Sequence, residues 1–295
     1  YEHIATDTWA EALDHLTPVA VSPDPAVHGL LALFPHENRV IPLDCALPIL
    51  HGANGEDGTV QGLFQLAGIP VAGCGTLASA LCMDKDRAHK LAKLAGVAVP
   101  RSLVLQAWED PQRAADFAQQ TGYPLFVKPV NAGSSYGISQ IHRPEELRPA
   151  LDLALEYDTQ VILEEAIPGF EVGCAVMGTQ ELVVGEIDEI ELSQGFFNFT
   201  EKYTLKTSAI HVPARVSPDT ARRVKETAKV IYRALGCTGF ARVDCFLTPE
   251  GQIVFNEVNT IPGFTEHSRF PGMMKAAGFS FPEILDTILG QVMAP

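Results

Sequence analysis

The most informative part of this chain of 295 residues is the stretch Ala-Arg-Val-Asp-Cys-Phe-Leu-Thr-Pro-Glu-Gly-Gln-Ile-Val-Phe-Asn-Glu-Val-Asn (residues 241–259). Two apolar runs flank the segment Thr-Pro-Glu-Gly-Gln (248–252), whose composition is typical of a tight turn. We therefore expect a hairpin of two antiparallel strands over 239–248 and 252–260.

The register of this hairpin predicts a polar face. With the turn centred on its Glu-Gly pair, Asp244 opposes Glu257 and Arg242 opposes Asn259, and alternation along a strand puts all four on one face. Opposed carboxylates repel unless a cation lies between them. Two carboxylates and an amide oxygen suit Mg²⁺, and Arg242 can bind a phosphate or a developing oxyanion. A solvated hairpin face of mixed charge is the alternative. The metal site is favoured because residues 259–264 contain a glycine turn that can aim backbone N–H groups at the metal.

Further upstream, Lys128 ends a short strand and precedes Gly-Ser-Ser-Tyr-Gly (133–137). A lysine, backbone N–H groups and hydroxyls at such a place can cover phosphates. The segment matches neither a Walker A loop nor a dinucleotide fingerprint, and a structural Gly-Ser turn is the alternative.

A third group follows an apolar strand expected over 160–165. The strand runs into Glu164, Glu165 and Ile167, with Glu171 behind them. The backbone of this strand can bind an adenine edge, and Glu171 can bind a ribose. The alternative is that this carboxylate is an ordinary surface group.

Residues 191–208 are polar and aromatic with weak periodicity, and we expect them to form a long functional loop. Lys202 and Tyr203 in this loop could close over a nucleotide and exclude water.

Two features nearer the N-terminus are weaker. The apolar run 40–51 predicts a buried strand ending at His51, and a Gly- and acid-rich turn containing Glu56 follows it; ligands gather at such strand ends. The alternative for His51 is a structural histidine, and the alternative for the acidic turn is a cap of the next helix. A helix is expected from Asp84 to a stop at Gly96, with Lys85 in its first turn, where a surface lysine is the alternative.

Composition excludes several classes of protein. Hydrophobic residues make up 46% and charged residues 19%, as in a folded chain of about two or three domains. A net charge of −15 argues against nucleic acid or an anionic membrane as a partner. No run approaches the roughly 18 apolar residues of a membrane span. We expect no signal peptide, and we expect the six cysteines to be buried thiols of a cytoplasmic protein.

Taken together and in order, these segments resemble the D-alanine–D-alanine ligase family of ATP-grasp enzymes. The resemblance runs from about His51 to the C-terminus, and its motifs are His51-Gly-x-x-Gly-Glu-Asp-Gly-Thr59, Met83-Asp-Lys85, Val127-Lys-Pro, Gly133-Ser-Ser-x-Gly137, Glu201-Lys-Tyr203, Ala241-Arg-Val-Asp244 and Asn256-Glu-Val-Asn-Thr-x-Pro-Gly263.

The resemblance implies an α/β ATP-grasp fold of three domains. These are an N-terminal parallel-sheet domain (1–75), a central domain (76–165) and a C-terminal catalytic domain (166–295) that grips ATP against the central one. It further implies two Mg²⁺ ions, or Mn²⁺ in their place, and a homodimer. The family also opens with a catalytic glutamate, for which Glu2 is the candidate if that glutamate lies in this sequence at all.

Site roles follow from the same resemblance. It implies that the nucleotide is contacted by Lys85, Lys128, Ser135, Lys202, Phe246 and Asn256, and that its adenine and ribose are contacted by Glu164, Glu165, Ile167 and Glu171. It implies metal ligands at Asp244, Glu257 and Asn259, and an oxyanion-stabilising pair formed by Arg242 and the Gly263 N–H. It also implies that Ser134 and Tyr203 are catalytic groups and that the substrates are contacted by His51, Glu56, Ser268 and Arg269.

The acceptor is predicted to be D-serine. The segment His-Ser-Arg-Phe-Pro-Gly-Met-Met (267–274) resembles the vancomycin-resistance ligases, and Arg269 stands where ordinary members carry an apolar residue. An arginine can donate to a hydroxyl. D-alanine is the alternative acceptor, and Glu201-Lys-Tyr203 makes D-lactate the least favoured. A catalytically silent ATP-grasp module is the remaining alternative.

Overall fold

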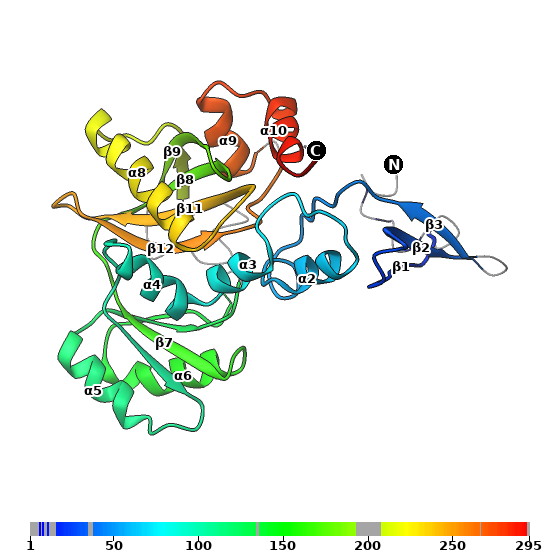
Figure 1. Ribbon diagram of the computed structural model, residues 1–295. Coiled ribbons are helices and arrows are strands. Elements are labelled where there is room, and N and C mark those ends of the chain that lie inside the picture. The colour runs from blue at the N-terminus through cyan, green and yellow to red at the C-terminus, as the bar shows by residue number, and fades with distance from the viewer. Residues whose placement is uncertain are drawn as a thin grey trace.

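The structure is a computed structural model, which describes residues 6, 8, 11, 16–34, 38–133, 136–192, 208–265 and 267–293. Its named strands form three sheets, and helices pack on two of them (Figure 1). Among the helices described, none is long and apolar enough to cross a membrane.

The first sheet is antiparallel, where the sequence predicted a parallel one. It has the order β1 (Val19–Val21), β2 (Gly29–Leu33) and β3 (Asn38–Pro42), and it lies apart from the other two sheets in Figure 1. The connections between these strands are too short for the crossover that parallel pairing needs. In this part of the described chain, parallel pairing is limited to the bridge between Ala46 and Val71.

The buried strand predicted over 40–51 is also wrong. All five residues of β3 are exposed, β3 ends at Pro42, and His51 lies exposed in the following loop. Pro42 and Pro48 have no N–H to donate, which disfavours continued strand pairing through this run.

Three helices follow: α2 (Thr59–Leu66), α3 (Thr76–Met83) and α4 (Lys85–Leu94). The predicted start of α4 is confirmed, because the Asp84 carboxylate caps the helix by accepting the Arg87 N–H at 2.8 Å. Leu94 is 85% exposed, since it lies about 200° around the helix from the buried Ala92.

The second sheet has the order β4 (Ser102–Gln106), β7 (Gln160–Glu165), β5 (Leu125–Pro129) and β6 (Ser139–Ile141). Its bounds confirm the strand predicted over 160–165. Helices α5 (Gln112–Thr121) and α6 (Leu147–Leu155) pack on one face, and the 3₁₀ turn η3 (Pro144–Glu146) directly precedes α6.

The third sheet carries the predicted hairpin. Its order is β10 (Ser208–His211), β9 (Leu182–Leu192), β8 (Phe170–Gly178), β11 (Phe240–Leu247) and β12 (Ile253–Asn259). Helix α8 (Pro218–Ala234), with α3 and α4, covers one face. Helices α9 (Arg269–Ala276) and α10 (Phe281–Met293) cover the other (Figure 1).

The predicted hairpin register is confirmed where the polar residues lie. Arg242 pairs with Asn259 and Asp244 pairs with Glu257, both on the α9 face of the sheet. Closer to the turn the register shifts by one residue, so that a β-bulge lies between the turn and the polar pairs. Bulges of this kind are common beside active sites, where they redirect side chains.

Candidate active site

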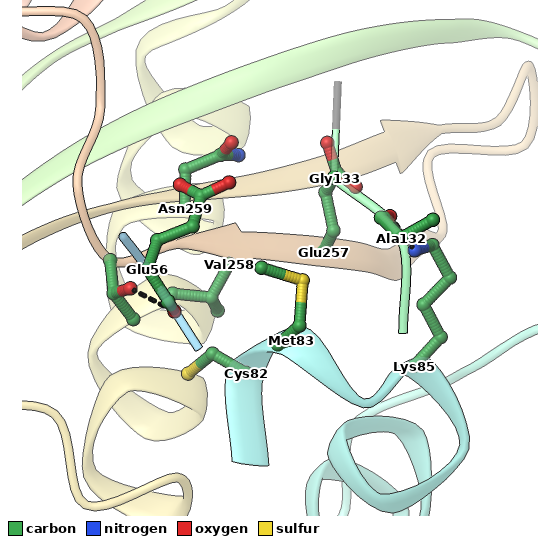
Figure 2. A pocket seen from close by; sticks show the side chains of 10 residues that line it. Glu56, Cys82, Met83, Lys85, Ala132, Gly133, Glu257, Val258 and Asn259 are labelled. Carbon is green, nitrogen blue, oxygen red and sulfur yellow. Dashed lines mark hydrogen bonds between the residues drawn. The ribbon is translucent and has the colours of Figure 1, made fainter. Parts of the chain in front are cut away.

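A pocket lies where loops of three regions meet the hairpin (Figure 2). Its walls come from the loop 52–58, the α3–α4 junction, the loop after β5, and the end of β12. Glu56, Cys82, Met83, Lys85, Ala132, Gly133, Glu257, Val258, Asn259 and Thr260 line it. Four of the motifs found far apart in the sequence therefore converge here.

Glu56 holds the loop 52–58 against the other walls. Its carboxylate accepts the Gly52 N–H at 3.0 Å, and its backbone carbonyl accepts the Thr260 hydroxyl at 3.3 Å (Figure 2). A Cβ at Gly133 would lie 2.9 Å from the Glu56 carboxylate and 3.2 Å from Gly52 Cα. A side chain at position 133 would therefore push the Glu56 carboxylate and the Gly52 backbone away from this loop.

The lysines predicted to bind phosphate have defined positions. The Lys85 ammonium donates to the carbonyl of Ala132 at 2.8 Å, which joins α4 to the loop after β5. Lys128 lies on β5, and its Nζ is 2.6 Å from an oxygen of Glu164 on β7. Lys85 and Lys128 are each about 8% exposed, so their charges are largely desolvated. Charges in such surroundings interact strongly with a bound anion.

Glu164 is the centre of a buried ionic group that includes His89. The His89 Nδ1 lies 3.3 Å from Glu164, and its Nε2 lies 2.8 Å from the carbonyl oxygen of Asn256. Burial of Glu164 disfavours its charge, but the Lys128 ammonium, followed by His89, holds the pKa of this carboxylate below its ordinary value. Glu164 therefore holds Lys128 in place. The sequence analysis predicted only an adenine contact for Glu164 and not this role.

Sequence reasoning missed His89. It lies on the buried face of α4, one turn after Lys85. The i, i+4 spacing from Lys85 is a signal that could have found it, because residues four apart share a face of a helix.

The adenine and ribose residues predicted next to Glu164 follow the chain from the end of β7 in the second sheet to the start of β8 in the third. Glu165 accepts the Arg101 N–H at 2.8 Å, and Ile167 is half-buried in the connection to β8. Phe246 of β11 is paired with Glu171 of β8. Of these predicted nucleotide contacts, the structure thus places Glu171 and Phe246 on neighbouring strands, and Glu165 and Ile167 at the passage between the two sheets.

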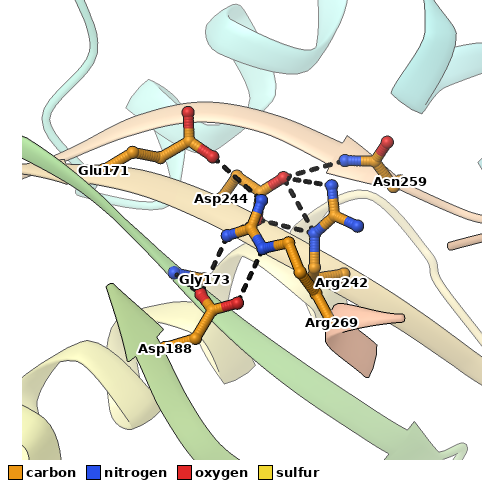
Figure 3. Close-up of polar contacts among 7 residues, drawn as sticks. All are labelled: Glu171, Gly173, Asp188, Arg242, Asp244, Asn259 and Arg269. Atoms are coloured by element: carbon orange, nitrogen blue, oxygen red, sulfur yellow. Dashed lines mark hydrogen bonds and ion pairs between the residues drawn. The ribbon is translucent and has the colours of Figure 1, made fainter. Parts of the chain in front are cut away.

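Two of the three predicted metal residues, Asp244 and Asn259, lie in a network of charges (Figure 3). The Arg242 guanidinium donates to Asp244 through Nε at 2.9 Å and through Nη2 at 2.7 Å. The Asn259 amide donates to the same carboxylate at 2.9 Å, and the Arg269 Nη2 lies 3.3 Å from it. Asp244 is about 1% exposed, so these donors replace its hydration.

The chemistry of the donor set fits a magnesium ion. Asp244, Glu257 and Asn259 offer hard oxygen donors on adjacent strands, and Mg²⁺ takes few such ligands beside phosphate oxygens and water. Within the described residues, no group of three His, Cys, Asp or Glu side chains is placed to hold a metal ion.

Asp188 is a second residue that sequence reasoning missed. It is fully buried on β9, and it accepts two hydrogen bonds from Arg269, at 2.6 and 2.8 Å. Arg269 also donates to Glu171 at 3.1 Å. Despite burial, Asp188 and then Asp244 raise the pKa of Arg269 above its ordinary value. Asp188 is one of four acidic residues in β9, and the strand pattern carried no signal of which of them meets Arg269.

The remaining predicted residues have mixed positions. The Ser268 hydroxyl accepts the Thr265 N–H at 3.0 Å at the start of α9, and a Cβ at Gly263 would lie 2.8 Å from it. His51 is exposed and does not line the pocket. Ser134, Ser135, Lys202 and Tyr203 lie outside the described residues, as do positions 193–207 of the predicted loop.

Comparisons with known proteins show which sequences and structures this chain resembles. Residues 6–74 match the sequence model described as "D-ala D-ala ligase N-terminus", and residues 91–290 match "D-ala D-ala ligase C-terminus". The vancomycin B-type resistance protein VanB of Enterococcus faecalis is 47% identical, over 92% of this chain and 80% of its own. A putative D-alanine–D-lactate ligase of Streptomyces coelicolor is also 47% identical, over 92% and 79%.

A solved structure is similar over almost the whole chain. The crystal structure of the VanG D-Ala:D-Ser ligase from Enterococcus faecalis is 56% identical, with a TM-score of 0.91 over 99% of this chain and 84% of that one. The predicted α/β ATP-grasp fold is thereby confirmed.

Proposed function

The chain belongs to the D-alanine–D-alanine ligase family, and from this premise we propose that it is an ATP-dependent ligase that joins D-alanine to D-serine. The observation that carries the choice of D-serine is the 56% identity and 0.91 TM-score to the VanG D-Ala:D-Ser ligase. The product would alter peptidoglycan precursors, and the resistance proteins among the relatives support a role in vancomycin resistance. We also propose that the enzyme acts in the cytoplasm.

The proposed reaction has two steps. A carboxylate oxygen of D-alanine attacks the γ-phosphorus of ATP, the bond to the β-phosphate oxygen breaks, and D-alanyl phosphate and ADP form. The amine of D-serine then loses a proton and attacks the carbonyl carbon, the C–O bond to phosphate breaks, and the dipeptide and inorganic phosphate form.

The residues of the site suit these steps through charge and position. The first step needs positioning and charge neutralisation, for which Lys85 and Lys128 are held by Ala132 and Glu164. Arg242 and the Gly263 N–H are proposed to stabilise the oxyanion of the second step. Asp244, Glu257 and Asn259 would hold Mg²⁺, which neutralises phosphate charge when bound.

Two other acceptors remain as alternatives. D-alanine is supported by the family to which the chain belongs, whose name describes D-Ala–D-Ala ligation. D-lactate is supported by the name of the Streptomyces coelicolor relative, whereas Glu201-Lys-Tyr203, a motif of dipeptide-forming members, argues against it.

The test is an analysis of products. The protein is incubated with ATP, Mg²⁺ and D-alanine, alone and with equimolar D-serine or D-lactate, and the products are separated by chromatography and weighed by mass spectrometry. We expect mainly D-Ala–D-Ser in the D-serine reaction. Mainly D-Ala–D-Ala would identify a housekeeping ligase, a depsipeptide would identify the D-lactate type, and no product would favour a silent module.

We further propose that the protein is a homodimer, as the family resemblance implies. Large apolar side chains on the first sheet support an interface there, because Val19, Leu33, Val40 and Ile41 are each more than 40% exposed. Light scattering coupled to gel filtration should give twice the 31.8 kDa of one chain, and a monomer at micromolar concentration would contradict the proposal.

A further inference from the structure

Arg269 is enclosed by carboxylates in the structure, although the sequence predicted that it reads the acceptor's hydroxyl. Each nitrogen of its guanidinium faces an acid: Nε and Nη2 bind Asp188, Nη1 binds Glu171, and Nη2 also faces Asp244 (Figure 3). We infer that Asp188 is a positioning residue, which holds Arg269 so that Arg269 fixes the two carboxylates of the nucleotide and metal site. The inference rests on the proposed function, because it takes Glu171 and Asp244 as ligand contacts.

Asp188 determines the orientation of the guanidinium. Its two oxygens lie 2.6 Å from the Arg269 Nε and 2.8 Å from Nη2, a two-point contact that fixes the plane of an arginine. One of these oxygens also accepts the Gly173 N–H of β8 at 2.8 Å. Asp188 is thus anchored to the sheet by backbone as well as by charge, with no exposure to solvent.

The other edge of the guanidinium spans two strands. Nη1 lies 3.1 Å from Glu171 on β8, and Nη2 lies 3.3 Å from Asp244 on β11, and these strands are direct neighbours. Glu171 is the proposed ribose contact and Asp244 the proposed metal ligand. Arg269 therefore sets the separation between the nucleoside end and the phosphate end of the site.

Gly173 provides the space for this arrangement. A Cβ at this position would lie 2.4 Å from the Arg269 Nη2, 2.5 Å from Asp188 and 2.9 Å from Asp244. Such contacts would displace all three side chains, since a Cβ does not approach other atoms this closely. The glycine lies in an extended strand, so its role is to leave room and not to adopt a special conformation.

The charges explain why Asp188 matters to the ligands. Arg269 is shared among Asp188, Glu171 and Asp244, and all of them are largely buried. Without the charge of Asp188, Arg269 would bind Asp244 and Glu171 more strongly and compete with the cation and the ribose for their oxygens. The network therefore keeps two ligand carboxylates oriented but available.

The experiment compares Asp188→Asn with wild type. Calorimetry measures the affinity for a non-hydrolysable ATP analogue with Mg²⁺, without amino acids, so that binding is read apart from ligation. We expect the affinity to fall about 10-fold or more, the usual effect of losing a residue that orients a ligand group. The half-saturating Mg²⁺ concentration for ligation should rise, and the ratio of D-Ala–D-Ser to D-Ala–D-Ala should stay unchanged.

The matched control is Glu189→Gln, on the same strand. Glu189 is also buried and also pairs with an arginine, because Arg215 donates to it at 2.7 Å, but it lies on the other face of β9. The Glu189→Gln variant should be less stable than wild type but should bind the nucleotide with unchanged affinity. Arg269→Lys keeps the charge but not the two-point contact, and it provides a second variant if Asp188→Asn does not fold.

The outcomes separate this inference from the proposed function. Unchanged nucleotide affinity in both Asp188→Asn and Arg269→Lys overturns the inference, as does a shift in the product ratio that occurs without any loss of affinity. An equal loss of affinity in Glu189→Gln also overturns it, since the effect is then merely structural. Wild type that binds nucleotide but ligates nothing contradicts only the proposed function, and wild type that binds no nucleotide contradicts both.

Discussion

At the scale of single residues, the site depends on buried charges that have partners. Glu164 is about 2% exposed, yet it stays charged because Lys128 and His89 lie against it. An isolated buried carboxylate would take up a proton instead. Asp244 and Arg242 are also buried, and they contact each other in the third sheet at 2.7 Å. Substitutions at these positions should therefore alter both stability and ligand binding.

Glu164→Gln should remove a pH-dependent contribution to stability. The folded-state pKa of Glu164 is lowered from its ordinary value of 4.5, so the unfolded chain protonates first as the pH falls. The contribution is therefore present above the unfolded pKa and is lost as the pH falls through the folded pKa. Urea unfolding of wild type and variant should show a difference in free energy that shrinks from pH 7 to pH 3.

The exposed Glu250 at the hairpin turn provides the control, as Glu250→Gln removes one carboxylate from the surface. A stability difference between wild type and Glu164→Gln that is constant across this pH range would contradict the argument.

Glu257→Gln should abolish ligation even at saturating Mg²⁺. Residues that only orient metal ligands change metal affinity or activity about 10–100-fold, so removal of a ligand itself should cost at least about 100-fold. Glu250→Gln on the same hairpin should retain wild-type activity. Near-normal turnover of Glu257→Gln, measured as phosphate release with D-alanine and D-serine, would show that Glu257 is not a metal ligand.

At the scale of elements, the hairpin and the helices that cover the third sheet carry the argument. The bulge between the turn and the polar pairs leaves Asp244 opposite Glu257, as the site requires. On the face that bears these residues, α10 buries Ile284 and Ile288 against the core. The helix keeps Gly290 on its exposed side. A residue of α10 can thus be changed without touching the site.

Gly290→Ala should stabilise the protein. An added Cβ meets no atom within 4 Å, and alanine loses less backbone entropy in a helix than glycine does. We expect the free energy of unfolding to rise by about 0.5–1 kcal/mol. Gly185→Ala is a control with the opposite expected sign. The added Cβ would lie 3.0 Å from the Met273 backbone, so this variant should be less stable than wild type. Denaturant unfolding followed by circular dichroism measures both, and a loss of stability in Gly290→Ala would contradict the assignment of an open position.

At the scale of the whole molecule, the site lies at a junction. Helix α4 links the second and third sheets, since Lys85 contacts the loop after β5 and His89 contacts both Glu164 of β7 and Asn256 of β12. The pocket draws on the loop 52–58 as well. A nucleotide bound here would contact several regions of the chain at once, and its binding should stabilise them together.

A non-hydrolysable ATP analogue with Mg²⁺ should therefore raise the unfolding temperature, and these regions should unfold together in a single transition. At a ligand concentration 100 times its Kd, the free energy of unfolding should rise by about 2.7 kcal/mol. Scanning calorimetry with increasing analogue measures the effect, and Mg²⁺ alone and analogue alone are the controls. An unchanged transition at every concentration would rule out nucleotide binding to the folded protein.

The sequence by itself determined the features that depend on neighbours along the chain. The two runs around the turn predicted β11 and β12, and the Asp84 cap started α4. These follow from local backbone preferences, which a short stretch of residues contains in full. The order of motifs along the chain indicated the family, whereas the bulge that leaves Asp244 opposite Glu257 was seen only in the structure.

Only the tertiary structure decided which distant side chains meet. Asp188 and Arg269 are 81 residues apart, and His89 reaches a carbonyl 167 residues away. The sequence also could not show that β3 is exposed. Burial and ion pairing depend on which elements pack together, and that packing is set by the sum of many contacts across the molecule and not by the residues beside each position.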